Sequence, residues 1–183
     1  QTDEVFELFS VPVVGGVNTK LNAPLASDRD VDTSATTIPD SNRVLFIADQ
    51  DTNDVFELYS VPLLGGATTK LSDPLVTDGF IQSFVISPDG DRVVYVASRN
   101  VVDQFELFSV AVVGGAVTAV SGALVSGGSV ESRFAFSPDS QRVVYIADQD
   151  VDAVNELYAS VDEVTPPPAS ASRLNAALVL RTC

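Results

Sequence analysis

The sequence predicts an all-β protein built from a repeat of about fifty residues, and three observations support this prediction. A Glu-Leu-aromatic motif recurs at spacings of 50, 49 and 50 residues, beginning at Glu7, Glu57, Glu106 and Glu156. Glycine pairs follow three of these motifs at the same step, at Gly15-Gly16, Gly65-Gly66 and Gly114-Gly115. No segment has a helical period, whereas β-branched and aromatic residues recur throughout. A repeat of this length decides the fold class before any single motif does.

Each repeat is predicted to hold four short strands, best seen in the third unit. The first spans 83–87 and ends at the Pro88-Asp89-Gly90 turn, where glycine is free to take a positive φ. The second, 92–97, is an almost unbroken apolar run, which suits a strand covered on both faces. The third and fourth span 105–113 and 117–121, on either side of a Gly-Gly turn. Such units predict propeller blades, because only neighbouring units can cover their two apolar faces. A parallel solenoid is the alternative, but its coils are usually shorter.

The order of motifs also resembles a known family. Ser87-Pro88-Asp89-Gly90 is followed by Arg92-Val93-Val94-Tyr95, a polar loop, Glu-Leu-aromatic and Gly-Gly, and the 133–147 stretch repeats its first half. This order resembles the TolB-type (PD40, WD40-like) β-propeller repeat. The resemblance implies antiparallel four-stranded blades around an axis, as in periplasmic or secreted propellers and in the gating domain of prolyl-oligopeptidase-like enzymes. The chain departs from the pattern at Ile38, where serine is expected before proline, and at Asn155, which replaces phenylalanine.

Counting strands predicts a single partial propeller over 1–183 with about three and a half blades. A half-blade covers 1–25, and full blades cover 31–75, 81–125 and 131–179. Propellers typically have at least four blades, so we expect an incomplete ring whose remainder comes from further sequence or from another chain. In the last blade a proline-rich segment, 164–172, replaces the Gly-Gly turn. We interpret it as an exposed, stiff loop, either a tolerated insertion, which is favoured, or a partner-docking loop.

Composition excludes several classes of function. The 183 residues are 45% apolar with a net charge of −15, so the chain is globular and repels nucleic acid and anionic membrane surfaces. No apolar run approaches the roughly 18 residues that a membrane helix needs. Methionine is absent and no signal peptide begins the sequence, so we expect a processed product or part of a longer protein. Histidine is absent and Cys183 is the only cysteine, which removes internal disulfides, thiolate metal clusters and Ser-His-Asp chemistry.

Two acidic loops are the only metal-site candidates that the sequence offers. They carry Asp49, Asp51 and Asn53 in one repeat and Asp148, Asp150 and Asp152 in another. Alternating carboxylates can supply the oxygen ligands that Ca²⁺ prefers. The corresponding loop 98–103 loses this pattern and contains Arg99, so ordinary solvated turns are favoured over calcium sites. No other cofactor is predicted.

The repeated glutamates are interpreted as structural rather than catalytic, because they lie inside a predicted strand. Hairpin register places Glu156 opposite about Ile146, far from Arg142. The repeated arginines, Arg43, Arg92 and Arg142, are therefore expected to meet the aspartate of their own turn or a neighbouring blade. No Gly-x-Ser-x-Gly elbow or phosphate loop is present, and nothing singles out a pair of acids for glycoside hydrolysis.

The sequence thus predicts a non-catalytic binding or assembly module that acts outside the cytoplasm, in the extracellular space or the periplasm. Its partner would be another protein or further copies of itself. The first alternative is the gating propeller domain of a larger prolyl-oligopeptidase-like hydrolase. The second is a structural subunit that self-assembles edge to edge through unpaired strands.

Overall fold

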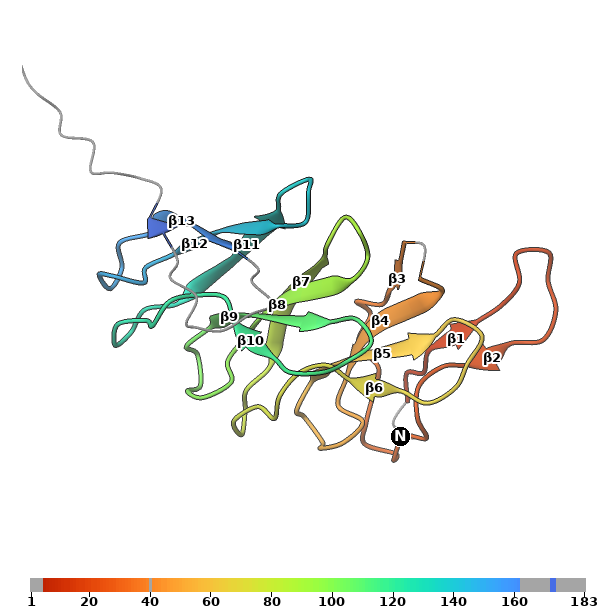
Figure 1. Cartoon of the computed structure of the whole chain (residues 1–183). Helices are drawn as coiled ribbons and strands as arrows, with labels where there is room; N and C mark the ends of the chain where they lie inside the picture. The colour runs from red at the N-terminus through yellow and green to blue at the C-terminus, as the bar shows by residue number, and fades with distance from the viewer. Residues whose placement is uncertain (1–4, 40, 162–171, 174–183) are drawn as a thin grey trace, which may run out of the picture.

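The computed structural model describes residues 5–39 and 41–160, together with the backbone of 161, 172 and 173. These residues form four antiparallel sheets that lie side by side in the order of the sequence (Figure 1). The predicted proline-rich loop at 164–172 lies almost entirely outside the described residues. The described part of the chain contains no helix long and apolar enough to cross a membrane.

The first sheet has two strands and each of the others has four. The first contains β1 (Phe9–Ser10) and β2 (Thr19–Lys20). The second contains β3 (Thr36–Ile38), β4 (Arg43–Ala48), β5 (Glu57–Pro62) and β6 (Thr69–Lys70). The third contains β7 (Ile81–Ile86), β8 (Arg92–Ala97), β9 (Glu106–Ala111) and β10 (Thr118–Ala119). The fourth contains β11 (Val130–Phe136), β12 (Arg142–Ala147), β13 (Glu156–Val161) and β14 (Ser172–Arg173).

Strand order within every four-stranded sheet follows the sequence, as in a propeller blade, and this confirms the predicted all-β class. The two-stranded sheet and the fourth sheet lie at opposite ends of the row, so the blades form a partial ring that does not close (Figure 1). From here the sheets are called the half-blade and the second, third and fourth blades.

Three hydrophobic cores fill the spaces between neighbouring blades. Alternate side chains of one strand point to opposite faces of a sheet, so an unbroken apolar strand serves two cores. In β8, Val93 and Tyr95 face the second blade, whereas Val94 and Val96 face the fourth. An aromatic pair from the second and third strands recurs in every full blade, with ring centroids 5.5–5.6 Å apart: Phe46–Tyr59, Tyr95–Phe108 and Tyr145–Tyr158. The predicted two-sided burial of 92–97 is confirmed.

The turn chemistry also follows the prediction. Ser87 Oγ donates to Asp89 Oδ1 at 2.5 Å and accepts from Arg92 N at 3.0 Å, which closes the turn between β7 and β8. Gly90 takes a φ of 76°, and Ser140 takes 61° at the same position of the next blade. The hydrogen bond from Ser87 has the largest effect in lowering the pKa of Asp89, and the hydrogen bond from the Asp91 amide lowers this pKa further.

Strand limits differ from the prediction where the backbone departs from regular pairing. β7 begins at Ile81, two residues early, because a register shift between Ile81 and Ser83 accommodates an extra residue. β9 and β10 are shorter than predicted because only two residue pairs join them before the chain turns. Glu156 lies opposite Ala147 rather than Ile146, a shift of one residue.

Backbone hydrogen bonds connect each blade to the next at one recurring place. The carbonyl of Phe6 accepts from Val31 N at 2.9 Å, that of Phe56 from Ile81 N, and that of Phe105 from Val130 N at 2.8 Å. The segment that leads into the third strand of one blade is therefore joined to the start of the next blade.

Candidate functional site

The first acid of each candidate calcium loop accepts hydrogen bonds from backbone amides. Asp49 is buried, and its two carboxylate oxygens accept from Asp30 N at 2.6 Å and Asp54 N at 3.0 Å. Asp148 accepts from Ser129 N and Ala153 N in the same way. In the third blade the hydroxyl of Ser98 accepts from Phe80 N at 3.1 Å, so a neutral acceptor replaces the carboxylate. This explains why the middle loop loses its acidic pattern without losing its fold.

The other calcium candidates have separate neighbours. Asp51 lies 3.4 Å from Lys70 Nζ, and Asn53 donates to Asp54 at 3.0 Å. Burial is the main cause of the raised pKa of Tyr145, and the charge of Asp150 raises it further. Asp152 lies against Gly127. Within the described residues no group of three or more His, Cys, Asp or Glu side chains could hold a metal ion. The favoured interpretation of these loops as ordinary turns stays a prediction, with calcium binding as its alternative.

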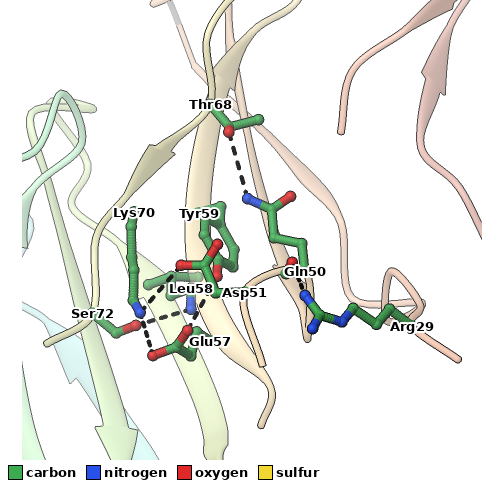
Figure 2. Close-up of polar contacts among 9 residues, drawn as sticks. All are labelled: Arg29, Gln50, Asp51, Glu57, Leu58, Tyr59, Thr68, Lys70 and Ser72. Atoms are coloured by element: carbon green, nitrogen blue, oxygen red, sulfur yellow. Dashed lines mark hydrogen bonds and ion pairs between the residues drawn. The ribbon is translucent and has the colours of Figure 1, made fainter. Parts of the chain in front are cut away.

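Each repeated glutamate has a partner in its own blade. Glu57 is buried, and it meets Lys70 Nζ at 2.5 Å and the Tyr59 hydroxyl at 3.1 Å (Figure 2). Burial raises the pKa of Tyr59, and the Glu57 charge raises it further. The equivalents of Glu57 pair with different groups: Glu7 with Lys20, Glu106 with Asn100 and Glu156 with the Tyr158 hydroxyl. Such pairing agrees with the structural interpretation of this position.

Two of the three repeated arginines bind a serine of their own blade, a partner that the sequence did not suggest. Arg43 Nη2 donates to Ser60 Oγ at 2.7 Å, and Arg92 Nε donates to Ser109 Oγ at 2.9 Å. Ser60 Oγ in turn donates to the carbonyl of Val112 in the third blade at 2.7 Å. Arg43 therefore reaches the neighbouring blade through the serine. For the third arginine, the expected partner is present: the Ser137 hydrogen bond lowers the pKa of Asp139 in the turn, and the charge of Arg142 lowers it further.

Sequence reasoning missed this serine, although it could have been found. Serine follows the Glu-Leu-aromatic motif at Ser10, Ser60 and Ser109, with the same 50- and 49-residue spacing, and Ala159 takes the place in the fourth blade. Register confirms the equivalence, because Leu45 lies opposite Ser60, Val94 opposite Ser109 and Val144 opposite Ala159.

The half-blade exposes the surface that the full blades bury. Phe9 pairs with Lys20 as Tyr59 pairs with Lys70, yet 49% of Phe9 is exposed, whereas Tyr59 and Phe108 are each 1% exposed. In the full blades this aromatic side chain packs in the core shared with the preceding blade, and the described residues contain neither a blade before the half-blade nor a strand beside β1 in the place that β4 takes beside β5. We call this the β1 edge, formed by the free side of β1 and the exposed apolar side chains around it: Phe6, Phe9, Val11, Val13 and Val14.

The serine of the half-blade is in the same position as its counterparts but lacks the arginine. Ser10 Oγ donates to the carbonyl of Leu63 at 2.7 Å, as Ser60 does to Val112. Among the described residues no arginine donates to Ser10. The link to the next blade is thus present, and the described residues contain no counterpart of the second strand that supplies the arginine in the second and third blades.

Two depressions open to solvent in the described residues, and both lie near the first strands of the blades. One of about 200 Å³ is lined by Phe6, Phe56 and the 30–33 segment. Its two acids bind backbone amides, Asp30 accepting from Phe6 N and Asp32 from Ser34 N. The other, of about 390 Å³, lies between β3 and β7 and is lined mainly by serine, threonine and glutamine side chains. Hydrogen bonding to a polypeptide or another polar ligand is the chemistry that these side chains offer.

No protein-family model matches the chain, and no curated protein sequence matches it. Solved structures do. A structure described as putative TolB from Agrobacterium tumefaciens superposes with a TM-score of 0.54 at 15% identity, over 93% of this chain and 62% of that one. The tricorn protease gives 0.55 at 17% identity, over 84% of this chain and 14% of its own.

A structure from work on two prolyl endopeptidases gives a TM-score of 0.52 at 14% identity, over 79% of this chain and 22% of that one. The chain thus spans less than two thirds of each of these proteins. At identities this low the likeness concerns the fold. The half-blade and the three full blades resemble blades of the β-propeller domains in TolB-like proteins, tricorn and prolyl endopeptidases, and they are arranged as a partial ring.

Proposed function

We propose that this chain is a non-catalytic propeller module that binds a polypeptide through its β1 edge and acts outside the cytoplasm. The observation that supports the proposal most directly is Phe9. A side chain that is buried in the second and third blades is half exposed in the half-blade, next to a strand edge that no other described strand pairs with. An exposed strand edge flanked by apolar side chains is a template for pairing with another polypeptide.

The net charge of the chain favours one class of partner over others. The net charge of −15 repels nucleic acid and anionic membrane surfaces, so a polypeptide with basic groups is favoured. The polar depressions and the engaged carboxylates give no grouping of nucleophile, base and oxyanion donor that would suggest catalysis. Release of the chain into the periplasm or medium, measured by cell fractionation, tests the proposed location.

The polypeptide-binding proposal is tested by placing a photo-crosslinking residue at position 9 of the full chain. A matched control carries the same group at position 102, because Val102 is also exposed but lies in a loop of the third blade. We expect position 9 to crosslink an identified polypeptide, either another protein or a second copy. The purified partner should then bind the native chain more tightly than it binds a Phe9→Ser variant. Equal crosslinking at both positions together with a monomeric native mass would refute the proposal.

A second candidate function is the propeller domain of a larger hydrolase. The observation in its favour is the shared fold with tricorn and prolyl endopeptidases, whose chains are much longer than the matched portion. The complete open reading frame distinguishes the two functions, since a catalytic domain in the same polypeptide would favour the hydrolase. Self-assembly is the third, and the native mass of the purified chain over a range of concentrations tests it.

A further inference from the structure

We infer that the depression between β3 and β7 is a binding site for a neutral saccharide. None of the residues that form the β1 edge lines it, so this inference goes beyond the proposed polypeptide-binding function and does not depend on it. Its volume is about 390 Å³, within the range of about 300–1,000 Å³ that is typical of small-molecule sites. The lining residues are Ser34, Thr36, Ile47, Gln82, Ser83 and Phe84.

The depression lies where two neighbouring first strands are not joined. Between the third and fourth blades, Ser83 Oγ donates to the Ser132 carbonyl at 3.4 Å and so connects β7 to β11. Counted back from the proline of each turn, Ser34 and Gln82 are the corresponding residues between the second and third blades. Within the part of the chain that the structure describes, no hydrogen bond joins these two residues. The space between them is therefore left open at this junction.

A bulge in the second blade forms one wall of the depression. Four residues, 32–35, lie between the Val31–Ala48 bridge and the Thr36–Leu45 pair, whereas β4 has two residues in the same interval. Bulges redirect side chains and are over-represented next to active sites. Here Ser34 lies within the bulge and Thr36 directly follows it, and both line the depression.

The polar side chains of the depression are available to a ligand. Ser34, Thr36 and Gln82 are all exposed, and among the described residues their side chains have no hydrogen-bond partner. Ser34 is bonded only through its backbone amide, which donates to Asp32 at 2.8 Å. A hydroxyl and a carboxamide can each donate and accept. Sugar hydroxyls also do both, so the two sets of groups can satisfy one another.

The absence of charge from the lining favours a neutral ligand over an ion. None of the six lining residues is ionisable. An anionic sugar would find no cation here, and the net charge of −15 would repel it. A cationic ligand would need a carboxylate, and the neighbouring Asp32 already accepts from the Ser34 amide.

Two apolar side chains complete the wall and favour a sugar over an extended peptide. Ile47 is buried and Phe84 is half-buried, and both line the depression beside the polar groups. A sugar ring presents C–H groups together with hydroxyls, which suits a wall of mixed character. An extended polypeptide is held mainly by main-chain hydrogen bonds along a strand edge. The side-chain hydroxyl and amide groups of this depression are better matched by a polyhydroxylated ligand.

The test titrates the full chain with five neutral sugars, which are glucose, galactose, mannose, maltose and cellobiose, and follows saturation transfer from protein to sugar by NMR. We expect at least one sugar to bind saturably and to shift the amide signals of 34–36 and 82–84. Thr36→Val and Gln82→Leu should each weaken binding about 2- to 12-fold, because each removes hydrogen bonds to the ligand. Both side chains are exposed, so the fold should be kept. Thr118→Val is the matched control, since Thr118 is also exposed but lies in β10, outside the depression.

Three results would overturn the inference. The first is that none of the five sugars binds. The second is that Thr36→Val and Gln82→Leu bind the sugar as tightly as the native chain and the Thr118→Val control, which would place the sugar elsewhere. The third is that glucuronic acid, glucosamine or the blocked peptide N-acetyl-Gly-Ser-Gly-amide binds these residues more tightly than the best neutral sugar. The site would then recognise a charge or a main chain. Crosslinking at position 9 is separate from all three, so the polypeptide-binding function stands or falls independently.

Discussion

Replacing Ser60 by alanine should destabilise the chain far more than the loss of one hydroxyl would suggest. Ser60 is fully buried, accepts from Arg43 Nη2 and donates to Val112 O, each at 2.7 Å. A hydrogen bond to a charged group contributes about 1.5–3 kcal/mol, and the neutral bond adds about 1 kcal/mol. Ser60→Ala also leaves a partly buried guanidinium and a carbonyl without this partner. We expect a loss of about 2–4 kcal/mol in the free energy of unfolding.

Ser10→Ala is the matched control for this substitution. Ser10 makes the same bond to the next blade, to Leu63 O at 2.7 Å, but it is partly exposed and receives no arginine from the described residues. Its loss should cost about 1 kcal/mol or less. The difference between the two variants isolates the contribution of the arginine.

The assay is urea unfolding followed by far-UV circular dichroism, with Ser60→Ala, Arg43→Met and the double variant forming a cycle. Because the two side chains are in contact, the cycle should give a coupling energy of about 0.5–3 kcal/mol. A coupling energy of zero would refute the reasoning. So would a Ser60→Ala variant no less stable than Ser10→Ala.

Three further predictions concern the turns, the loops and the buried tyrosines. Gly90→Ala should cost at least about 1 kcal/mol, more than Gly15→Ala, because both have positive φ but only at Gly90 would a Cβ lie 2.8 Å from Pro39 O. Asp49→Ala should lower unfolding free energy by about 1–3 kcal/mol, and Asp49→Ser by less, since Ser98 fills the same role in the third blade. Burial raises the pKa of Tyr145 to about 12. The folded state therefore keeps this phenol neutral. The contribution of Tyr145 to the free energy of unfolding is complete below pH 10, and it falls by about 1.4 kcal/mol per pH unit as the pH rises toward 12.

Each of these has a measurement that can contradict it. Urea midpoints at neutral pH that are equal for Gly90→Ala and Gly15→Ala would remove the steric contribution of Pro39. Asp51→Asn is the control for Asp49, because its carboxylate is half exposed and should matter by less than about 0.5 kcal/mol. For Tyr145, stability is measured between pH 8 and 11.5. A Tyr145→Phe variant that declines as steeply as the native chain would refute the assignment.

The bounds of the second strand were predictable to the residue because several sequence signals mark the same first and last positions. An arginine, an apolar run and a preceding turn delimit 92–97, and burial on both sides leaves no freedom in register. The first strand was less predictable because its shift at Ile81 depends on the stagger between β7 and β8, which sequence period does not encode. The outer strands are shorter than their propensity suggests because pairing to a single neighbour ends where the chain turns away.

The contacts of the polar side chains were harder to predict than the strands. Arg43 and Ser60 lie 17 residues apart, and only the register of β4 on β5 brings them within hydrogen-bond distance. The structural role of Asp49 was hidden because an acid that accepts backbone amides has the same sequence pattern as an acid that binds calcium. The strand count predicted an unpaired edge at β1, whereas the exposure of the Phe9 side chain could be seen only in the structure.

The recurring bonds from Val31, Ile81 and Val130 to the phenylalanine carbonyls have a consequence for how the chain loses its structure. They connect each blade only to its immediate neighbours, so stability is shared locally, as in a row of coupled units. Opening should then begin at the ends of the row and move inward one blade at a time, because an end unit has a single neighbour. The second and third blades, each held from both sides, would be the last to exchange their amide protons, and the half-blade could open without unfolding the others.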